Sequence, residues 1–383
     1  MNLTADILYA GVYDRELDLF EGQYPVENGA TYNSYIIMDS KVAVMDGVDG
    51  RFSDAWLKGI EEKLQGRQPD YIVVHHMEPD HGASVFAFLE KYPKAMMVAS
   101  AQAVKVAQSY FLADLSQRAV TVKEGDVLDL GRHKLRFIAA PMVHWPEVMV
   151  SFDDADGVLF SADAFGTFGS FEGSGDWAGE AARYYFGIVG KFGIQAQNLL
   201  KKAAGLNIKM ILPLHGPVLK DNAAQCVDLY SKWTSYTPED EGVTLCYASV
   251  YGGTKAVAET LAAELEKNGQ HIVEVFDLAR CDQSAALAAA FRHSRLVLAS
   301  PTINGNVFPA VKNFIAALAD HNYQKRFIAL IETGMWAPCS AKCMTELLGG
   351  CKDITFSSTK VKVTGHASEA DLACVKALAL ELS

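Results

Sequence analysis

The sequence predicts an α/β protein of two domains. The chain has 383 residues, half of them hydrophobic, which is more than one ordinary domain requires. From residue 243 onward, apolar strand-like runs alternate with helical patterns, which is typical of a doubly wound parallel sheet. The polar stretch 237–242, with Pro238 and Gly242, precedes this change. We therefore predict domains at residues 1–240 and 241–383.

Composition excludes several classes of protein. The net charge of -12 argues against a nucleic-acid partner, because phosphate binding needs clustered Lys and Arg. The chain shows no apolar run of about 18 residues, so no membrane span is expected. Its start shows no secretory signal, and its seven cysteines all follow residue 225. An odd cysteine count in one half favours a reducing cytoplasm over a disulfide framework.

Metal-ligand chemistry is concentrated directly after an apolar run that we expect to be a buried strand. The motif there is His76-x-Glu78-x-Asp80-His81. Pro79 should bar a helix through the motif, so we expect a loop at the strand end. Carboxylates and imidazoles supply lone pairs, and burying them together is costly without cations. The motif therefore predicts a metal site; the alternative is a solvated polar turn.

Three later residues repeat this arrangement. Strands are expected at 135–139, 158–161 and 210–212, and each is followed by a polar residue: His144, Asp163 and His215 respectively. Each of these alone could be structural, but together they indicate ligands from loops on one rim of a sheet scaffold. Of the other histidines, His75 is expected to support its neighbour, and His133 is expected to lie in a solvated turn.

The 76–81 motif resembles the binuclear metal signature of the metallo-β-lactamase superfamily, with Glu78 where its hydrolases usually have His. This form is similar to the flavodiiron proteins, which implies a metallo-β-lactamase-like αββα sandwich with two irons. The extra carboxylate suits iron better than an imidazole-rich zinc site. By the resemblance one iron would be held by His76, Glu78 and His144, the other by Asp80, His81 and His215, with Asp163 as the bridge.

The second half predicts five strand–helix units. Strands are expected at 243–248, 272–276, 296–299, 327–331 and 361–363, and helices at 254–267, 284–292, 308–319, 341–348 and 369–382. The loop after the first strand ends at a helix N-terminus, which suits a phosphate. It has neither the ATP-type P-loop order nor Gly-x-Gly-x-x-Gly, so neither an ATP site nor a nicotinamide fingerprint is indicated.

Three loops of this half resemble the FMN loops of flavodoxins, which implies a flavodoxin-like FMN-binding domain. Trp336 offers an aromatic face to the flavin ring. The alternative is a flavodoxin-like domain that binds nothing. The matching residues are Ser249, Tyr251, Gly252, Gly253 and Thr254 in the first loop, Pro301, Thr302, Asn304 and Gly305 in the second, and Thr333, Gly334 and Trp336 in the third.

The resemblance implies an oxidoreductase that reduces O2 to water, NO to N2O, or both. Electrons would pass through FMN from a separate donor such as rubredoxin or a reductase. The family arrangement is a head-to-tail homodimer or a dimer of such dimers. Two alternatives remain: a binuclear zinc hydrolase fused to an electron-carrier module, and a redox-sensing module without turnover.

Two further features stand apart from this pattern. Many family members have a His in an early Phe-His-Gly-Tyr-like segment, where this chain has Glu21. We expect Glu21 to lie in the substrate pocket and to influence the choice between O2 and NO. Cys339 and Cys343 lack the Cys-x2-Cys spacing of a zinc knuckle or rubredoxin. At their helical spacing of four residues, we expect them to be buried small side chains.

Overall fold

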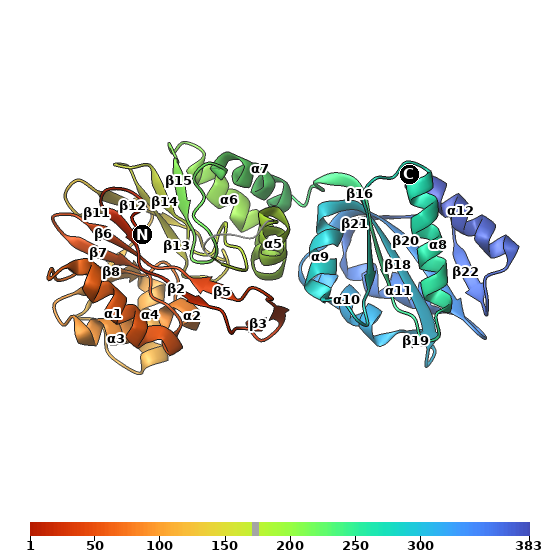
Figure 1. Cartoon of the computed structure of the whole chain (residues 1–383), viewed down its shortest axis with the longest axis horizontal. Helices are drawn as coiled ribbons and strands as arrows, with labels where there is room; N and C mark the ends of the chain where they lie inside the picture. Colours follow the sequence, from red (N-terminus) through yellow and green to blue (C-terminus); the bar gives the residue numbers. More distant parts are fainter. Residues whose placement is uncertain (171–175) are drawn as a thin grey trace. The chain divides into compact units, whose positions relative to one another are not determined.

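The computed structural model describes residues 1–170 and 176–383, which form two compact units, Met1–Ser231 and Lys232–Ser383 (Figure 1). The division falls within α7 (Ala223–Thr234), a few residues before the polar stretch 237–242. Among the described residues, no helix combines the length and apolarity needed to cross a bilayer.

Two sheets face each other in the first unit, and helices cover their outer faces (Figure 1). The first sheet has the order β1-β6-β7-β8-β9-β10 and the second has the order β11-β12-β13-β14-β15. The strands of the first sheet are β1 (Ile7–Tyr9), β6 (Tyr35–Met38), β7 (Val42–Met45), β8 (Tyr71–Val73), β9 (Met96–Ser100) and β10 (Ala119–Val122). Those of the second are β11 (Val127–Asp129), β12 (Lys134–Ala139), β13 (Met149–Asp153), β14 (Val158–Phe160) and β15 (Met210–Leu212). This confirms the predicted αββα sandwich.

Apolar side chains fill the space between these sheets. Ile37, Val73 and Val98 from the first sheet belong to the same buried cluster as Phe137 and Phe160 from the second. Helix α4 packs on β9 and β10, and α6 packs on β12. The main helices of this unit are α1 (Ser53–Leu64), α3 (Val85–Lys91), α4 (Ala101–Phe111), α5 (Trp177–Tyr184) and α6 (Gly193–Ala203).

The strands that lead into the predicted ligand loops run parallel. β7, β8 and β9 form one parallel set, and β14 pairs parallel with β15. Strands in parallel register end at the same edge, so their following loops meet there. One local expectation was wrong: Pro79 does not keep the motif out of helix but starts the short helix α2 (Pro79–Gly82). Proline is favoured at the first helical position, where its missing N–H has no partner to lose.

A parallel sheet forms the second unit, in the order β17-β16-β18-β20-β21, with β22 also paired to β20. This confirms the predicted doubly wound sheet. The strands are β16 (Asp240–Tyr247), β17 (Val273–Asp277), β18 (His293–Ile303), β20 (Gln324–Gly334), β21 (Lys352–Phe356) and β22 (Val361–Thr364). β21 was not predicted, because this edge strand is mostly exposed and its sequence shows no apolar run.

The five predicted helices are present as α8 (Gly253–Lys267), α9 (Gln283–Arg292), α10 (Pro309–Asp320), α11 (Ser340–Leu347) and α12 (Glu369–Leu382). α8 and α12 pack together and bury Leu261 and Leu378 in one core with Leu245 of β16. α9, α10 and α11 form a second contiguous layer (Figure 1). Cys339 and Cys343 at the start of α11 are partly exposed, so the expectation of buried small side chains was wrong. The sheet therefore has helices on both faces, and its strand-end loops remain accessible to a ligand.

A candidate binuclear metal site and flavin pocket

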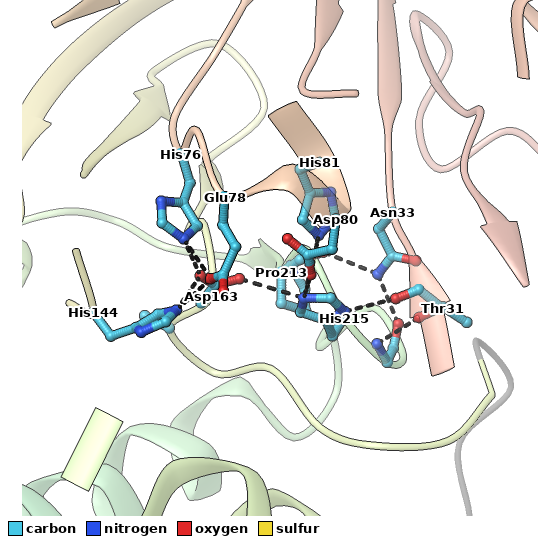
Figure 2. A network of polar contacts seen from close by, with 12 residues as sticks. Thr31, Asn33, His76, Glu78, Asp80, His81, His144, Asp163, Pro213 and His215 are labelled. Atoms are coloured by element: carbon cyan, nitrogen blue, oxygen red, sulfur yellow. Dashed lines mark hydrogen bonds and ion pairs between the residues drawn. The ribbon is translucent and has the colours of Figure 1, made fainter. Parts of the chain in front are cut away.

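All seven predicted metal ligands meet at one rim of the sandwich (Figure 2). They fall into two groups, and in each group the possible ligand atoms lie within 4.8 Å of one another. One group is His76, Glu78, His144 and Asp163; the other is Asp80, His81 and His215. This division matches the grouping that the family resemblance implies.

Asp163 lies between the two groups, with one oxygen toward each. Its Oδ2 is 3.2 Å from Nε2 of His76 and 3.4 Å from Nε2 of His144. Its Oδ1 is 3.5 Å from Nε2 of His215. Within the described part of the chain, neither oxygen has a hydrogen-bond partner, although the side chain is buried. A buried carboxylate that lacks well-formed hydrogen bonds is unfavourable, and two cations, one on each side, would satisfy it.

The histidines of the second group are oriented as metal ligands. His81 Nδ1 is 3.0 Å from the Gly47 carbonyl oxygen, and His215 Nδ1 is 2.7 Å from that of Thr31. A carbonyl oxygen only accepts, so each Nδ1 carries the proton, and in the neutral ring Nε2 presents a lone pair. The two Nε2 atoms lie 3.2 Å apart. Two facing lone pairs repel, and a shared cation removes the repulsion.

Glu147 holds His76 and was not predicted. Its Oε1 lies 2.8 Å from His76 Nδ1 and accepts the Met77 backbone N–H at 3.1 Å. A carboxylate on the remote imidazole nitrogen fixes the ring and raises the basicity of the other nitrogen. The sequence contained no signal for this role beyond a carboxylate near His144.

The His215 loop has a similar support. Asn33 donates from Nδ2 to the carbonyl oxygens of Pro213 (2.9 Å) and Gly216 (2.8 Å), and Thr31 Oγ1 accepts the Gly216 N–H at 2.7 Å (Figure 2). Asn33 lies 180 residues before Pro213 in the sequence, so the loop is held in place by the packing of distant segments. Neither Asn33 nor Thr31 was predicted.

Opposite charges in the cluster shift its pKa values strongly. Burial raises the pKa of Asp163, but the charges of His76 and His144 outweigh it and lower the pKa well below its usual range. Burial also raises the pKa of Glu78, yet hydrogen bonds from His144 and His76 bring it down to about 2. For His144, burial lowers the pKa, whereas contacts with Asp163 and Glu78 raise it to about 9. The carboxylates are thus ionised, and cations would displace imidazole protons.

Close backbone approach also shapes the rim. A Cβ on Gly47 would lie 2.4 Å from the His81 carbonyl oxygen and 2.4 Å from Ser84 Oγ. Only glycine therefore lets the chain after β7 reach the carbonyl position that orients His81.

The two remaining histidines of this unit support the structure. His75 contacts Asp46 Oδ2 at 2.6 Å and Ser151 Oγ at 2.8 Å, and so ties the strand end below the ligands. His133 is fully buried, so the expectation of a solvated turn was wrong. Its Nδ1 lies 3.0 Å from Asp153, and Arg132 contacts its other nitrogen. Arg132 supplies positive charge there, which makes that cluster an ion-pair network.

Glu21 occupies the turn between β3 (Leu19–Phe20) and β4 (Tyr24–Pro25). Burial raises the pKa of its carboxyl, and the nearby charge of Glu78 raises it further. Gln23 donates to its Oε2 at 3.1 Å, and the preceding Phe20 ring packs edge-on against His215, with centroids 5.1 Å apart. The hairpin therefore lies against the cluster of predicted metal ligands, and the charge of Glu78 in that cluster affects the pKa of the Glu21 carboxyl.

The predicted flavin loops converge on one pocket of about 380 Å³ in the second unit. Every predicted residue except Gly252 lines it, and Gly252 lies beside it as the N-cap of α8 at φ +89°. Four loops contribute: the three predicted ones and the loop after β22, which adds Gly365. Gly365 was not predicted, because a single glycine after a strand carries no specific signal.

The pocket rim has the chemistry of a site for a flat, phosphate-bearing ligand. The side chains of Tyr251, Met335 and Trp336 are 99%, 77% and 81% exposed. Such large apolar surfaces around one pocket indicate a partner that covers them. At the base, Thr254 Oγ1 lies 2.7 Å from Thr333 Oγ1, at the first turn of α8, where backbone N–H groups favour an anion.

Comparison with known proteins identifies a known domain type in each unit. Residues 30–216 match the ODP family beta lactamases, and residues 244–348 match a flavodoxin domain. The anaerobic nitric oxide reductase flavorubredoxin of Vibrio vulnificus (strain YJ016) is 28% identical over 349 residues, which are 88% of this chain and 70% of that protein. The Salmonella paratyphi A protein of the same name is 28% identical over 344 residues, 87% and 71% of the two chains.

Solved structures give the same result. The rubredoxin oxygen:oxidoreductase from the anaerobe Desulfovibrio gigas matches with TM-score 0.91 and 25% identity, covering 100% of this chain and 97% of that chain. The flavodiiron protein from Giardia intestinalis matches in fold with TM-score 0.92 and 23% identity, covering 99% and 95%. The fold and sites thus define an oxidoreductase with a metallo-β-lactamase-like domain followed by a flavodoxin domain. Over nearly its whole length the chain is similar to the flavorubredoxins and to the oxygen oxidoreductase named above, and it shares its fold with flavodiiron proteins.

Proposed function

We propose that this oxidoreductase reduces O2 to water, NO to N2O, or both, at a di-iron site supplied with electrons through FMN. The observation that carries the proposal is Asp163, whose two buried oxygens face two separate groups of ligand atoms. The relatives named above are a nitric oxide reductase and an oxygen oxidoreductase, which supports these two substrates.

Within this site each residue has a defined task. Bound iron supplies the redox chemistry and polarises the diatomic substrate. One ion would be held by His76, Glu78 and His144, and the other by Asp80, His81 and His215. Asp163 would contribute to both. Glu147 and the Gly47 and Thr31 carbonyls keep the imidazoles oriented. FMN would occupy the second-unit pocket, with its phosphate at the start of α8 and its ring against Trp336.

The comparisons do not favour a zinc hydrolase fused to an electron carrier. A carboxylate at position 78 raises the oxygen content of the ligand set, and oxygen ligands suit iron better than zinc. The test is Glu78→His, which we expect to shift the metal content toward zinc and to abolish gas reduction. Ester or thioester cleavage by the unmodified, zinc-loaded protein would instead support the hydrolase.

Glu21 is proposed to influence the choice between O2 and NO, because its carboxyl lies where the charge of Glu78 reaches it. Glu21→His should change the ratio of O2 to NO turnover while iron and FMN contents stay constant. Glu21→Gln is the matched control for charge alone. An unchanged ratio in both variants would remove Glu21 from the proposal.

For partners, we propose a separate electron donor such as rubredoxin or a reductase, a cytoplasmic location, and a head-to-tail homodimer or a dimer of such dimers. In that dimer the FMN of one chain would serve the irons of the other. The test mixes an iron-deficient variant (Glu78→Ala with Asp163→Ala) with an FMN-deficient one (Thr254→Val with Trp336→Ala). Regained activity in heterodimers supports the crossed arrangement, and confirmed subunit exchange without activity contradicts it.

A further inference from the structure

Tyr32 lies against both imidazoles of the second ligand group and is not itself a predicted ligand. Its ring centroid lies 5.9 Å from that of His81 and 5.9 Å from that of His215, with interplanar angles of 74° and 73°. Both contacts are edge-on, an arrangement that aromatic rings favour. Tyr32 is only 3% exposed. One buried side chain therefore forms a common wall for the two ligands whose Nε2 atoms face each other.

The backbone at Tyr32 supports His215 as well. The peptide that joins Thr31 to Tyr32 carries the carbonyl oxygen that lies 2.7 Å from His215 Nδ1 (Figure 2). This peptide belongs to β5 (Ala30–Tyr32), which pairs antiparallel with β2 (Val12–Asp14). The position of Tyr32 thus determines both a hydrogen bond and a ring contact of His215.

Arg51, in the 3-10 helix Gly50–Phe52, joins Tyr32 to two carboxylates. Its Nη2 donates to the Tyr32 hydroxyl at 3.3 Å and lies 2.9 Å from Asp14 Oδ2 of β2. Its Nε donates to Asp49 Oδ1 at 2.9 Å. The Asp14 side chain is 4% exposed, and among the described residues its Oδ2 has no well-formed hydrogen bond. Leaving this oxygen without a cation is costly, so the ion pair holds Arg51 in place.

The guanidinium contacts connect the two segments that orient the imidazoles. Asp49 lies two residues after Gly47, whose carbonyl oxygen is 3.0 Å from His81 Nδ1. Tyr32 belongs to the segment that orients His215. The guanidinium therefore restrains the spacing of these segments, and with it the separation of the two Nε2 atoms, which is 3.2 Å. An ion bound by both imidazoles needs both lone pairs at fixed positions.

We propose that Tyr32 and Arg51 are positioning residues for the second metal ion. They hold the two imidazoles of the second group so that both bind the same ion, and neither is itself a ligand. The first group has a different support, Glu147 behind His76, so the two ions should respond separately to changes at Tyr32 and Arg51. This inference rests on the proposed binuclear site and adds the residues that control the affinity of one of its ions.

The test uses Co2+ as the probe, because its visible spectrum depends on the number and geometry of its ligands. The full-length, FMN-bound, iron-free protein is titrated with Co2+ in competition with a chelator, and its metal-free spectrum is subtracted to remove the flavin absorption. The native protein should show two binding steps. His215→Ala, which removes a ligand of the second group, identifies the step that belongs to this group. Tyr32→Leu and Arg51→Met should weaken that step about tenfold and change its spectrum, while the other step stays constant.

Matched variants separate positioning from general stability. Tyr32→Phe keeps the ring and loses only the hydroxyl contact with Arg51, so it should recover most of the affinity that Tyr32→Leu loses. Arg132→Met is the control for Arg51→Met and should leave both steps unchanged. Arg132 is 51% exposed, against 55% for Arg51, and it also pairs with two carboxylates, Asp6 and Asp156, neither of which is a candidate ligand.

Three results would overturn the inference. The first is an unchanged second-group step in both Tyr32→Leu and Arg51→Met, the second is an equal effect of Arg132→Met, and the third is equal weakening of both steps. A native protein that bound a single Co2+ would contradict the binuclear site. The inference would fail with that site only if His215→Ala left the single step intact; otherwise Tyr32→Leu and Arg51→Met would still decide it.

Discussion

The candidate metal site and the flavin pocket are built in opposite ways. The candidate metal site consists of buried and partly buried histidines and carboxylates. Three of its imidazoles are held at Nδ1 by a further residue: His76 by Glu147, His81 by Gly47 and His215 by Thr31. The flavin pocket consists of strand-end loops whose aromatic side chains are exposed, as Trp336 is. A metal ion requires ligand side chains that are already held in position. A large cofactor has apolar surface of its own, and this surface can cover the exposed side chains of an open pocket.

The largest effect expected from this contrast follows loss of the Asp163 carboxylate, whose two oxygens face the two groups of ligand atoms. Asp163→Asn keeps the size of the side chain but removes the charge that faces both groups of ligands. We expect loss of bound iron and a fall in gas reduction of at least about 1000-fold. FMN content, read from visible absorbance, should not change. Asp228→Asn, at an exposed position of α7, is the control. Retention of iron by Asp163→Asn would contradict the bridging role.

A smaller effect is expected behind the metal ligands. Glu147→Gln can still contact His76 but loses the charge that makes the imidazole a stronger ligand. Iron affinity, measured by chelator competition, should fall about 10- to 100-fold. Glu124→Gln, at an exposed glutamate that pairs with Lys202, should leave iron affinity unchanged. Equal effects of the two changes would show that the contact with His76 does not position the ligand.

On the flavin side the expected effects are more modest, because several loops share the contacts. Trp336→Ala removes one exposed face of the pocket rim and should weaken FMN binding by about tenfold at most. Trp336→Phe should recover part of the affinity. Fluorescence titration measures both, and iron content should stay constant. A larger loss of iron than of FMN in Trp336→Ala would contradict the independence of the two sites.

The smallest effect concerns a histidine that only stabilises the fold. Burial lowers the pKa of His293, but its hydrogen bond to Glu274 and the charge of Asp240 outweigh this and raise it. A raised pKa contributes stability that is complete below the unfolded value near 6.5 and is lost as pH rises through the folded value. His293→Gln should therefore cost on the order of 1 kcal/mol near pH 6 and less at pH 9.

Hydrogen exchange of the β16 and β18 amides in the full-length chain measures this difference locally. If His293→Gln lowered the free energy of unfolding equally near pH 6 and at pH 9, the charge of His293 would not contribute to stability.

Side chains that commonly bind metals could be predicted from the sequence because they are grouped in one motif. Common residues that support those ligands could not, because only the fold brings them into contact. His76, Glu78, Asp80 and His81 stand together in one motif. Asn33 and Glu147 are common residue types whose roles arise only when distant segments pack against them.

The same limit applies to the fold. The alternating strands and helices after residue 243 predicted the parallel sheet, because buried strands need continuous apolar runs. The edge strand β21 carries no such run and was missed. His133 looked like a solvated turn because its burial depends on Asp153 and Arg132, which surround it only in the folded chain.

The most direct test of the central claim is the content of metal and flavin in one preparation, followed by a single turnover. The full-length protein, produced with iron available, should contain about two irons per chain together with FMN. After anaerobic reduction, exposure to NO or O2 should reoxidise the flavin and yield N2O or water. A protein that contains zinc in place of iron, or whose reduced flavin stays reduced in the presence of both gases, would contradict it.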